Sequence, residues 1–311
     1  MMPISQVLPR ASGGVSIPTY IGGKTVAASG GSTELDKFDT AALTCAPNTQ
    51  ALKTATTLAG PVWSAQAGYW MCGLNGGTLN IVQKILYSTE ATSNVGVSAG
   101  ATQTRTSFFG PSYGRVFRIT ANFHIDYVKF SDDTRGNEYS GIAYPGFVAR
   151  NNGRGPCSAT FGYIFGGDWV GLFKNNVDNY QYSTTTFSAM ANFLTTLEAC
   201  QPVNNRPAGK GYLLGYVQTN DPTAINDVIE VDFATHTYFS LVTALVDGQG
   251  EGAGVYNTTH GFACGGSPAV PYPPQDTDRI QRFDFATKTT AMLGVVLTSQ
   301  KEGQGGVSTT V

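Results

Sequence analysis

The side chains that most often carry acid–base or metal chemistry are sparse and widely spaced in this chain. It has three histidines, His124, His236 and His260, with neither HxH nor HExxH spacing. Because a metal site needs ligands that converge on one point, this spacing argues against a histidine metal centre, and we expect no cofactor. Paired carboxylates would suit glycoside hydrolysis, but the sequence places no two of them at a working distance. The candidate carboxylates are Asp132, Asp133, Asp168, Asp178, Asp227, Asp276 and Asp278.

Aromatic side chains in loops are the stronger candidates for a binding function. A loop at 168–176 carries Trp169 and Phe173, and a proline-rich loop at 267–278 carries Tyr272. Such side chains offer a large, rigid contact area at a low cost in entropy. They suit contact with a sugar or a protein, although Trp169 and Phe173 also suit packing between structural units. We expect these three aromatic residues to form a binding surface.

The chain that carries these loops contains a repeated sequence segment. The segment 280–289 (IQRFDFATKT) closely echoes 228–237 (VIEVDFATHT), and weaker copies begin at 177, 125, 82 and 35. Successive starts are 47, 43, 52, 51 and 52 residues apart. A period of this size is the signature of a repeat architecture, which moves the question of function from a catalytic core to loops and faces.

Each copy contains the elements of a four-stranded antiparallel unit. A short apolar run bounded by glycine, such as 162–167 (GYIFGG) or 261–266 (GFACGG), precedes the repeated segment and is typical of a strand buried on both faces. Further short strands follow the repeated segment. Four strands in each of six units predict an all-β, six-bladed β-propeller. At the repeat position of Asp232 and Asp284 we expect a carboxylate that caps a turn by accepting bonds from backbone amides.

The two chain ends predict how the ring closes. The C-terminal segment 305–311 (GGVSTTV) matches 253–259 (AGVYNTT), a strand that comes just before a glycine-bounded run. The run that should come next is found at the other end, at 24–31. We therefore expect the C-terminal strand to pair with N-terminal strands, which removes the free sheet edges, and we assign 24–311 to the propeller.

Residues 1–23 stand outside the repeat and form a candidate docking arm. Part of this segment, 14–21, also has the composition of a strand, which would instead make it part of the first blade. The apolar residues assigned to the arm are Ile4, Val7, Leu8, Ile17 and Tyr20.

The repeat resembles a divergent kelch-type propeller blade. In that family an apolar strand ends in Gly-Gly, and the next strand carries an aromatic–Asp pair and a later aromatic residue. The usual tryptophan is absent here, and the second and third units lack the glycine pair, so the resemblance implies the architecture alone. The low-charge, Gly- and Thr-rich repeats also resemble propeller modules of tailed-bacteriophage virion proteins. The residues that follow the kelch pattern include Gly166, Gly167, Tyr180, Phe187, Gly265, Gly266, Phe283 and Asp284.

The amino-acid composition argues against several classes of protein. Charged residues make up 13% of the 311 residues, against roughly 25% in soluble proteins. The net charge is −2 without a basic run, so we expect no nucleic-acid partner. No apolar stretch reaches the ~18 residues of a membrane-spanning helix, and the N-terminus lacks the pattern of a signal peptide.

The five scattered cysteines favour free, buried thiols, Cys72 and Cys264 among them, and synthesis in a reducing cytoplasm.

Three functional hypotheses follow. The leading one is a non-enzymatic structural and binding protein of a phage virion (tail fibre, tail tip or surface decoration), made in the host cytoplasm. It would attach to other virion proteins through its arm and present loops to a host glycan or protein. The alternative is a cellular kelch-like interaction module. The third is a glycan-active propeller enzyme, which would require a clustered acidic or metal site.

Overall fold

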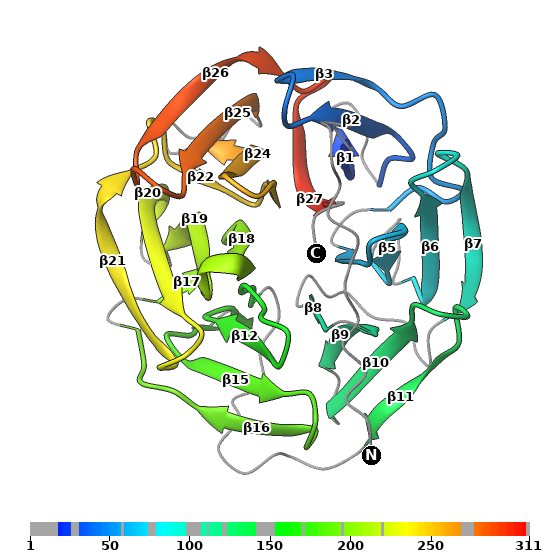
Figure 1. The fold of residues 1–311 in the computed structure, drawn as a ribbon, viewed down its shortest axis with the longest axis horizontal. Helices are drawn as coiled ribbons and strands as arrows, with labels where there is room; N and C mark the ends of the chain where they lie inside the picture. Colours follow the sequence, from blue (N-terminus) through cyan, green and yellow to red (C-terminus); the bar gives the residue numbers. More distant parts are fainter. Residues whose placement is uncertain are drawn as a thin grey trace.

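A computed structural model of the chain shows six small antiparallel sheets arranged as blades around a common axis (Figure 1). This arrangement confirms the predicted all-β, six-bladed propeller. Among the residues that the structure describes, the one helical element is a short 3₁₀ turn, η1 (Arg206–Ala208). The described residues are 18–25, 31–56, 59–73, 79–97, 107–110, 112–119, 123–140, 153–169, 172–193, 196–218, 221–268 and 277–308.

The first three blades each have four strands, which follow one another from the axis outward (Figure 1). Blade 1 contains β27 (Lys301–Val307), β1 (Thr19–Thr25), β2 (Leu35–Asp39) and β3 (Thr44–Pro47). Blade 2 contains β4 (Gly60–Trp63), β5 (Ala67–Met71), β6 (Ile81–Leu86) and β7 (Thr92–Val97). Blade 3 contains β8 (Ser107–Phe109), β9 (Tyr113–Ile119), β10 (Phe123–Lys129) and β11 (Arg135–Ser140).

The other three blades follow the same plan with small additions. Blade 4 contains β12 (Phe161–Phe165), β15 (Val177–Gln181) and β16 (Thr186–Ala189), and its innermost position is taken by single bridges from Arg154 and Cys157 to β12. Blade 5 contains β18 (Pro202–Asn205), β19 (Lys210–Gln218), β20 (Asp221–Asp232) and β21 (Thr237–Ala244). Blade 6 contains β23 (Ala253–Tyr256), β24 (His260–Pro268), β25 (Thr277–Asp284) and β26 (Thr290–Val296). The additions are a hairpin of β13 (Asp168–Trp169) and β14 (Leu172–Phe173), β17 (Leu197–Glu198) beside β19, and β22 (Gln249–Gly250) beside β24.

Blade 1 joins the two ends of the described chain. β27 pairs antiparallel with β1, with Tyr20 opposite Val307 and Gly22 opposite Gly305, and β1 pairs in turn with β2. The predicted closure by pairing of C-terminal and N-terminal strands is therefore confirmed. The indole N–H of Trp70 in β5 donates to the carbonyl oxygen of Gly305 at 3.0 Å, so the closing strand is also tied to blade 2.

The N-terminal strand of the ring lies earlier in the chain than the sequence suggested. β1 begins at Thr19, ahead of the boundary expected at residue 24, and the Tyr20 side chain is 0% exposed. Tyr20 therefore belongs to the core and not to a docking arm, because β27 and β2 hold its strand on both sides. The other residues assigned to the arm, Ile4, Val7, Leu8 and Ile17, lie outside the described residues.

The hairpin turn between the two outer strands follows one plan in all six blades. Where an aspartate ends the inner of these strands, its Oδ1 accepts bonds from two turn amides, at 2.8 and 3.0 Å for Asp232 and at 2.9 and 2.8 Å for Asp284. This confirms the capping role predicted for both residues. The turn then ends on a residue in the left-handed region, which completes the chain reversal. These residues, with φ from 53° to 59°, are Leu43, Glu90, Asp133, Thr185, His236 and Lys288.

The side chains of this turn form the junction with the preceding blade. Tyr163 in the second strand of blade 4 stacks on Phe233 in the turn of blade 5, with ring centroids 5.4 Å apart and an interplanar angle of 16°. The Tyr163 hydroxyl also lies 2.9 Å from Nδ1 of His236, the left-handed residue of that turn. Such stacks add to the free energy of burial itself, so they help to hold the blades in register. The same stack joins Tyr20 with Tyr87, Tyr69 with Phe130, and Tyr212 with Phe285.

A glycine before the second-strand aromatic residue allows the blades to approach closely. A Cβ atom on Gly68 would lie 2.4 Å from Cγ2 of Val307 in blade 1, and one on Gly211 would lie 2.3 Å from Cβ of Pro156 in blade 4. The repeated Gly–aromatic pair therefore serves two junctions. The glycine admits the innermost strand of the preceding blade, and the aromatic ring stacks on the turn of the following blade.

In blades 2 and 6, a buried glutamine in the third strand anchors the loop that enters the blade. The Gln83 side chain donates to the carbonyl of Thr54 at 2.9 Å and accepts from its amide at 2.8 Å. Gln281 makes the same pair of bonds with Asp247, at 2.9 and 3.0 Å. These bonds satisfy backbone groups in the crossing between blades, which would be costly to bury unpaired.

Candidate functional site

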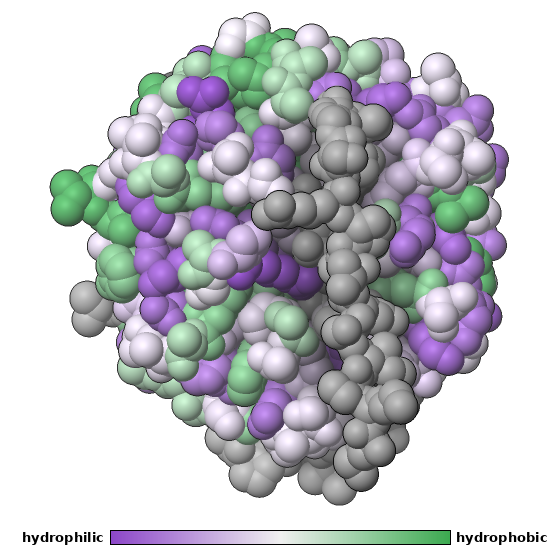
Figure 2. Space-filling model, viewed as in Figure 1, coloured by the Kyte–Doolittle hydropathy of each residue, from purple (hydrophilic) through white to green (hydrophobic). Residues whose placement is uncertain are grey.

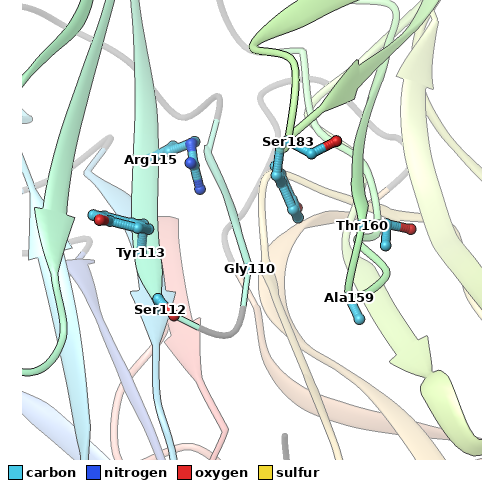
Figure 3. A pocket seen from close by; sticks show the side chains of 8 residues that line it. Gly110, Ser112, Tyr113, Arg115, Ala159, Thr160 and Ser183 are labelled. Atoms are coloured by element: carbon cyan, nitrogen blue, oxygen red, sulfur yellow. The ribbon is translucent and has the colours of Figure 1, made fainter. Parts of the chain in front are cut away.

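A cavity in the described part of the molecule lies between blades 3 and 4. It has a volume of about 270 Å³. Figure 3 shows Arg115 extending from β9 into the space between the two blades, with Ser183 and Thr160 on the opposite side. Arg115 and Gly110 are buried, whereas Ser112, Thr160 and Ser183 are exposed, so the cavity has a cationic floor and a hydroxyl-bearing rim. Its lining is Gly110, Ser112, Tyr113, Arg115, Ala159, Thr160, Tyr182 and Ser183.

Arg115 is packed among aromatic rings. Its guanidinium carbon lies 4.8 Å from the ring centroid of Tyr182, 5.2 Å from that of Tyr113 and 5.9 Å from that of Tyr180. These distances are within the ~6 Å range of a cation–π interaction. Burial raises the pKa of Tyr182 well above its ordinary value, so its hydroxyl stays protonated at neutral pH. Gly110 allows this arrangement, because a Cβ there would lie 2.9 Å from Cδ2 of Tyr182.

Three residues of the cavity lining, Gly110, Ser112 and Tyr113, belong to a segment with the residue spacing of a serine-hydrolase motif. Reasoning from the sequence missed this motif. The segment 110–114 (GPSYG) is a G-x-S-x-G pattern centred on Ser112, and 96–100 (GVSAG) is another centred on Ser98. A nucleophile elbow requires a turn from a strand into a helix, whereas Ser112 lies in the hairpin turn between β8 and β9. The cavity lining includes neither histidine nor carboxylate. Ser98 lies outside the described residues.

The structure describes the backbone position of two of the three aromatic residues that were predicted to form a binding surface. Trp169 and Phe173 lie in β13 and β14, which form a hairpin with Trp169 opposite Leu172. Tyr272 lies outside the described residues. The β13–β14 hairpin belongs to the connection between the second and third strands of blade 4. The cavity is lined by turns that join first to second strands and third to fourth strands, so it lies at the opposite face of the ring. The binding role of the three aromatic residues stays a prediction.

The histidines occupy three blades, and two of them have structural partners. His236 contacts Tyr163 at a blade junction. His260 lies 3.2 Å from Asp284 through Nε2, and Thr259 Oγ1 lies 2.7 Å from its Nδ1. Burial and the nearby Arg282 guanidinium lower the pKa of His260 despite the opposing effect of Asp284. His124 lies in β10. None of this brings the three histidines together.

The candidate carboxylates are also distributed around the ring. Asp133 accepts a hydrogen bond from the Tyr69 hydroxyl at 2.8 Å and pairs with Lys84 at 2.7 Å, across the junction of blades 2 and 3. Asp132 pairs with Lys129 in the same turn, and Asp227 accepts from the hydroxyl of Tyr216. Asp178, 2% exposed, stands at the repeat position of Gln83 and Gln281. Asp168 lies in β13 and Asp278 in β25, whereas Asp276 lies outside the described residues.

The structure bears out the thiol prediction for the two cysteines singled out. Neither Cys72 nor Cys264 forms a disulfide, and both are buried, at 1% and 0% exposure. Burial raises the pKa of Cys264 well above its ordinary value, which disfavours the reactive thiolate.

Searches for related proteins give a fold and no family. No protein-family model matches the chain, and no curated protein matches it. The solved structure of YjhT matches with a TM-score of 0.67 and covers 89% of this chain and 94% of its own. The identity is 12%. The likeness therefore shows the propeller fold alone.

Metal-binding clusters and membrane-spanning helices are both absent from the described residues. Among these residues, no cluster of three or more His, Cys, Asp or Glu side chains is placed to hold a metal ion. Within the same part of the chain, no helix is both long and apolar enough to cross a membrane. Figure 2 shows polar and apolar residues interspersed over one face of the ring, with a larger apolar area at its outer rim.

Proposed function

We propose that this protein is a non-enzymatic structural and binding propeller of a tailed-phage virion, as a tail-fibre, tail-tip or surface-decoration component. The ring would serve as a rigid scaffold, and its loops would contact a host glycan or protein. In this proposal the repeat is a divergent kelch-type blade, in keeping with the positive φ angles of Gly166 and Gly167 just after β12 and of Gly265 and Gly266 at the register shift within β24.

One observation carries the proposal: ionisable residues of the repeat are engaged in building the ring. Asp133 bridges two blades. Glu230 pairs with Lys210 at 3.1 Å within blade 5 and with Lys288 of blade 6 at 2.9 Å. Residues committed to such networks stabilise the scaffold and are poorly suited to change protonation during a reaction, because moving one proton would disturb a junction. The composition of the repeats supports the virion context.

The test of the virion role is the protein content of purified particles. Quantitative mass spectrometry should find the chain in washed particles at a fixed copy number that matches the symmetry of one substructure. A chain present only in the lysate of infected cells, and absent from washed particles, would exclude the virion role and favour the cellular interaction module.

The test of the loop surface is a pair of substitutions. Trp169→Ala with Tyr272→Ala should leave assembly intact and weaken attachment to the host surface, since loss of an aromatic hot spot costs roughly 2 kcal/mol or more. Phe239→Ala is the matched control, because Phe239 is 49% exposed on the outer strand β21, away from these loops. Equal attachment by the double variant and the control would refute the role of the loops.

A further inference from the structure

The junction of blades 3 and 4 lacks the stacked pair of aromatic rings found at four other junctions. Opposite the third residue of the repeated segment, the second strand carries an aromatic residue in five blades and arginine in blade 3. At 3% exposure, Arg115 is nearly as buried as those aromatic residues. A buried guanidinium carries a desolvation cost that an aromatic ring does not. Proteins retain such a costly departure from a repeated structural pattern mainly at functional sites, so we examine Arg115 as a candidate functional residue. The five aromatic residues are Tyr20, Tyr69, Tyr163, Tyr212 and Phe262.

The departure coincides with the cavity between blades 3 and 4. Arg115 lines the cavity and lies over the ring of Tyr182, which stands where Tyr87, Phe130 and Phe233 stand in other blades. A flat stack of two rings at this junction is thereby replaced by a cation beside a ring. The cation is thus held in place by its neighbours before any ligand arrives, which limits the entropy lost on binding.

The lining has a defined chemistry. A guanidinium presents paired N–H donors that match the two oxygens of a carboxylate. Aromatic rings offer apolar faces, and the rim hydroxyls of Ser112, Thr160 and Ser183 both donate and accept hydrogen bonds. The volume of about 270 Å³ falls just below the ~300–1,000 Å³ of sites for drug-sized ligands, so the cavity suits a single small ring.

We propose that this cavity binds one carboxylate-bearing sugar unit of the hexuronate type, with the carboxylate on Arg115, the ring against Tyr182 and the sugar hydroxyls on the rim. The inference rests on the proposed function as a binding protein and names the ligand class of a second surface on it. The unit is either a free monosaccharide or the end of an acidic polysaccharide.

The experiment measures binding to the full chain by titration calorimetry with ligand-observed NMR. D-glucuronate should bind, whereas D-glucose, which has the same ring without the carboxylate, should bind at least ten-fold more weakly. Inorganic phosphate, an anion without a sugar ring, should also bind at least ten-fold more weakly. An oligosaccharide that ends in glucuronate separates the two sources: tighter binding than the monosaccharide indicates a polysaccharide end, and weaker binding indicates the free sugar.

Arg115→Tyr is the decisive variant, because it installs the residue type of the other junctions. This variant should keep the melting temperature of the wild type, and its affinity for glucuronate should be at least ten-fold weaker. Arg279→Ala is the matched control: Arg279 pairs with Asp247 on the exposed surface of blade 6, away from the cavity. It should bind glucuronate like the wild type. Should Arg115→Tyr fail to fold, Thr160→Ala at the exposed rim supplies the same test with a smaller expected loss.

Several results would overturn the proposal. They are equal affinity for glucose and glucuronate, phosphate binding as tight as glucuronate binding, and unchanged binding by a folded Arg115→Tyr variant. Its failure is distinguishable from failure of the proposed function. No glucuronate binding by a protein that is found in washed particles refutes the cavity assignment alone. Binding by a protein absent from particles refutes the virion role alone.

Discussion

The ring closure can be tested at the contact of Gly68 in blade 2 with Val307 in the C-terminal strand β27. Val307 in β27 is 0% exposed. A Cβ on Gly68 would lie 2.4 Å from its Cγ2 and 2.8 Å from its Cβ, distances that force one group to move. Gly68 is not among the glycines with positive φ, so its backbone accepts alanine. Gly68→Ala is therefore a steric perturbation of the closing junction.

The expected magnitudes follow from the groups involved. Overpacking by the added methyl should lower the free energy of unfolding by about 1–3 kcal/mol. Val307→Ala removes two buried carbons at about 0.8 kcal/mol each, and the residual cavity brings the loss to about 2 kcal/mol. In the double variant the methyl at position 68 fills the space that the valine leaves. The combined loss should therefore be smaller than the sum of the single losses by at least ~1 kcal/mol.

The assay is urea unfolding followed by tryptophan fluorescence, because Trp70 is 1% exposed and bonded to β27. Gly294→Ala provides the matched control, since a Cβ at that position meets nothing within 4 Å. Its effect should add to that of Val307→Ala within ~0.5 kcal/mol. Additive losses for Gly68→Ala and Val307→Ala would show that β27 does not pack against blade 2, and the proposed closure would be wrong.

Three further predictions concern a turn, a thiol and the N-terminus. Asp232→Ala should cost about 1 kcal/mol at pH 7 through its lost hydrogen bonds. Hydrogen bonds from Lys210 and the turn amides lower the Asp232 pKa below its usual 3.8, so this stabilisation is full above pH 4 and shrinks as the pH falls; an unchanged difference in acid would contradict the cap. Cys264 should react with a thiol reagent only on unfolding, and fast labelling of the native protein would show that its strand is misplaced. A chain that starts at Pro18 keeps every described strand and should keep its melting temperature and its elution volume in gel filtration, whereas a chain that lacks β1 should aggregate.

Much of the propeller could be predicted because its determinants are local. Asp284 caps a turn through amides two and three residues away, and this bond depends only on the short segment that contains it. The glycine-bounded runs predict buried strands for the same reason. The position of the first strand could not be read in this way. Lys24 to Gly31 has the better local pattern, but Tyr20 occupies the strand because it pairs with Val307 and stacks on Tyr87.

In the candidate site, too, some features depend on local sequence and others on tertiary contacts. The sequence by itself determined the period, the strand order of a blade and the turn chemistry, because these depend on backbone preferences within a few residues. It also contained the Gly114–Arg115 pair, which departs from the Gly–aromatic rule and is visible once the repeats are aligned. Only the tertiary structure decided that Arg115 meets Tyr182 and lines a cavity, because that contact exists between two blades. The closed ring sets the spacing of those blades, and no local segment encodes it.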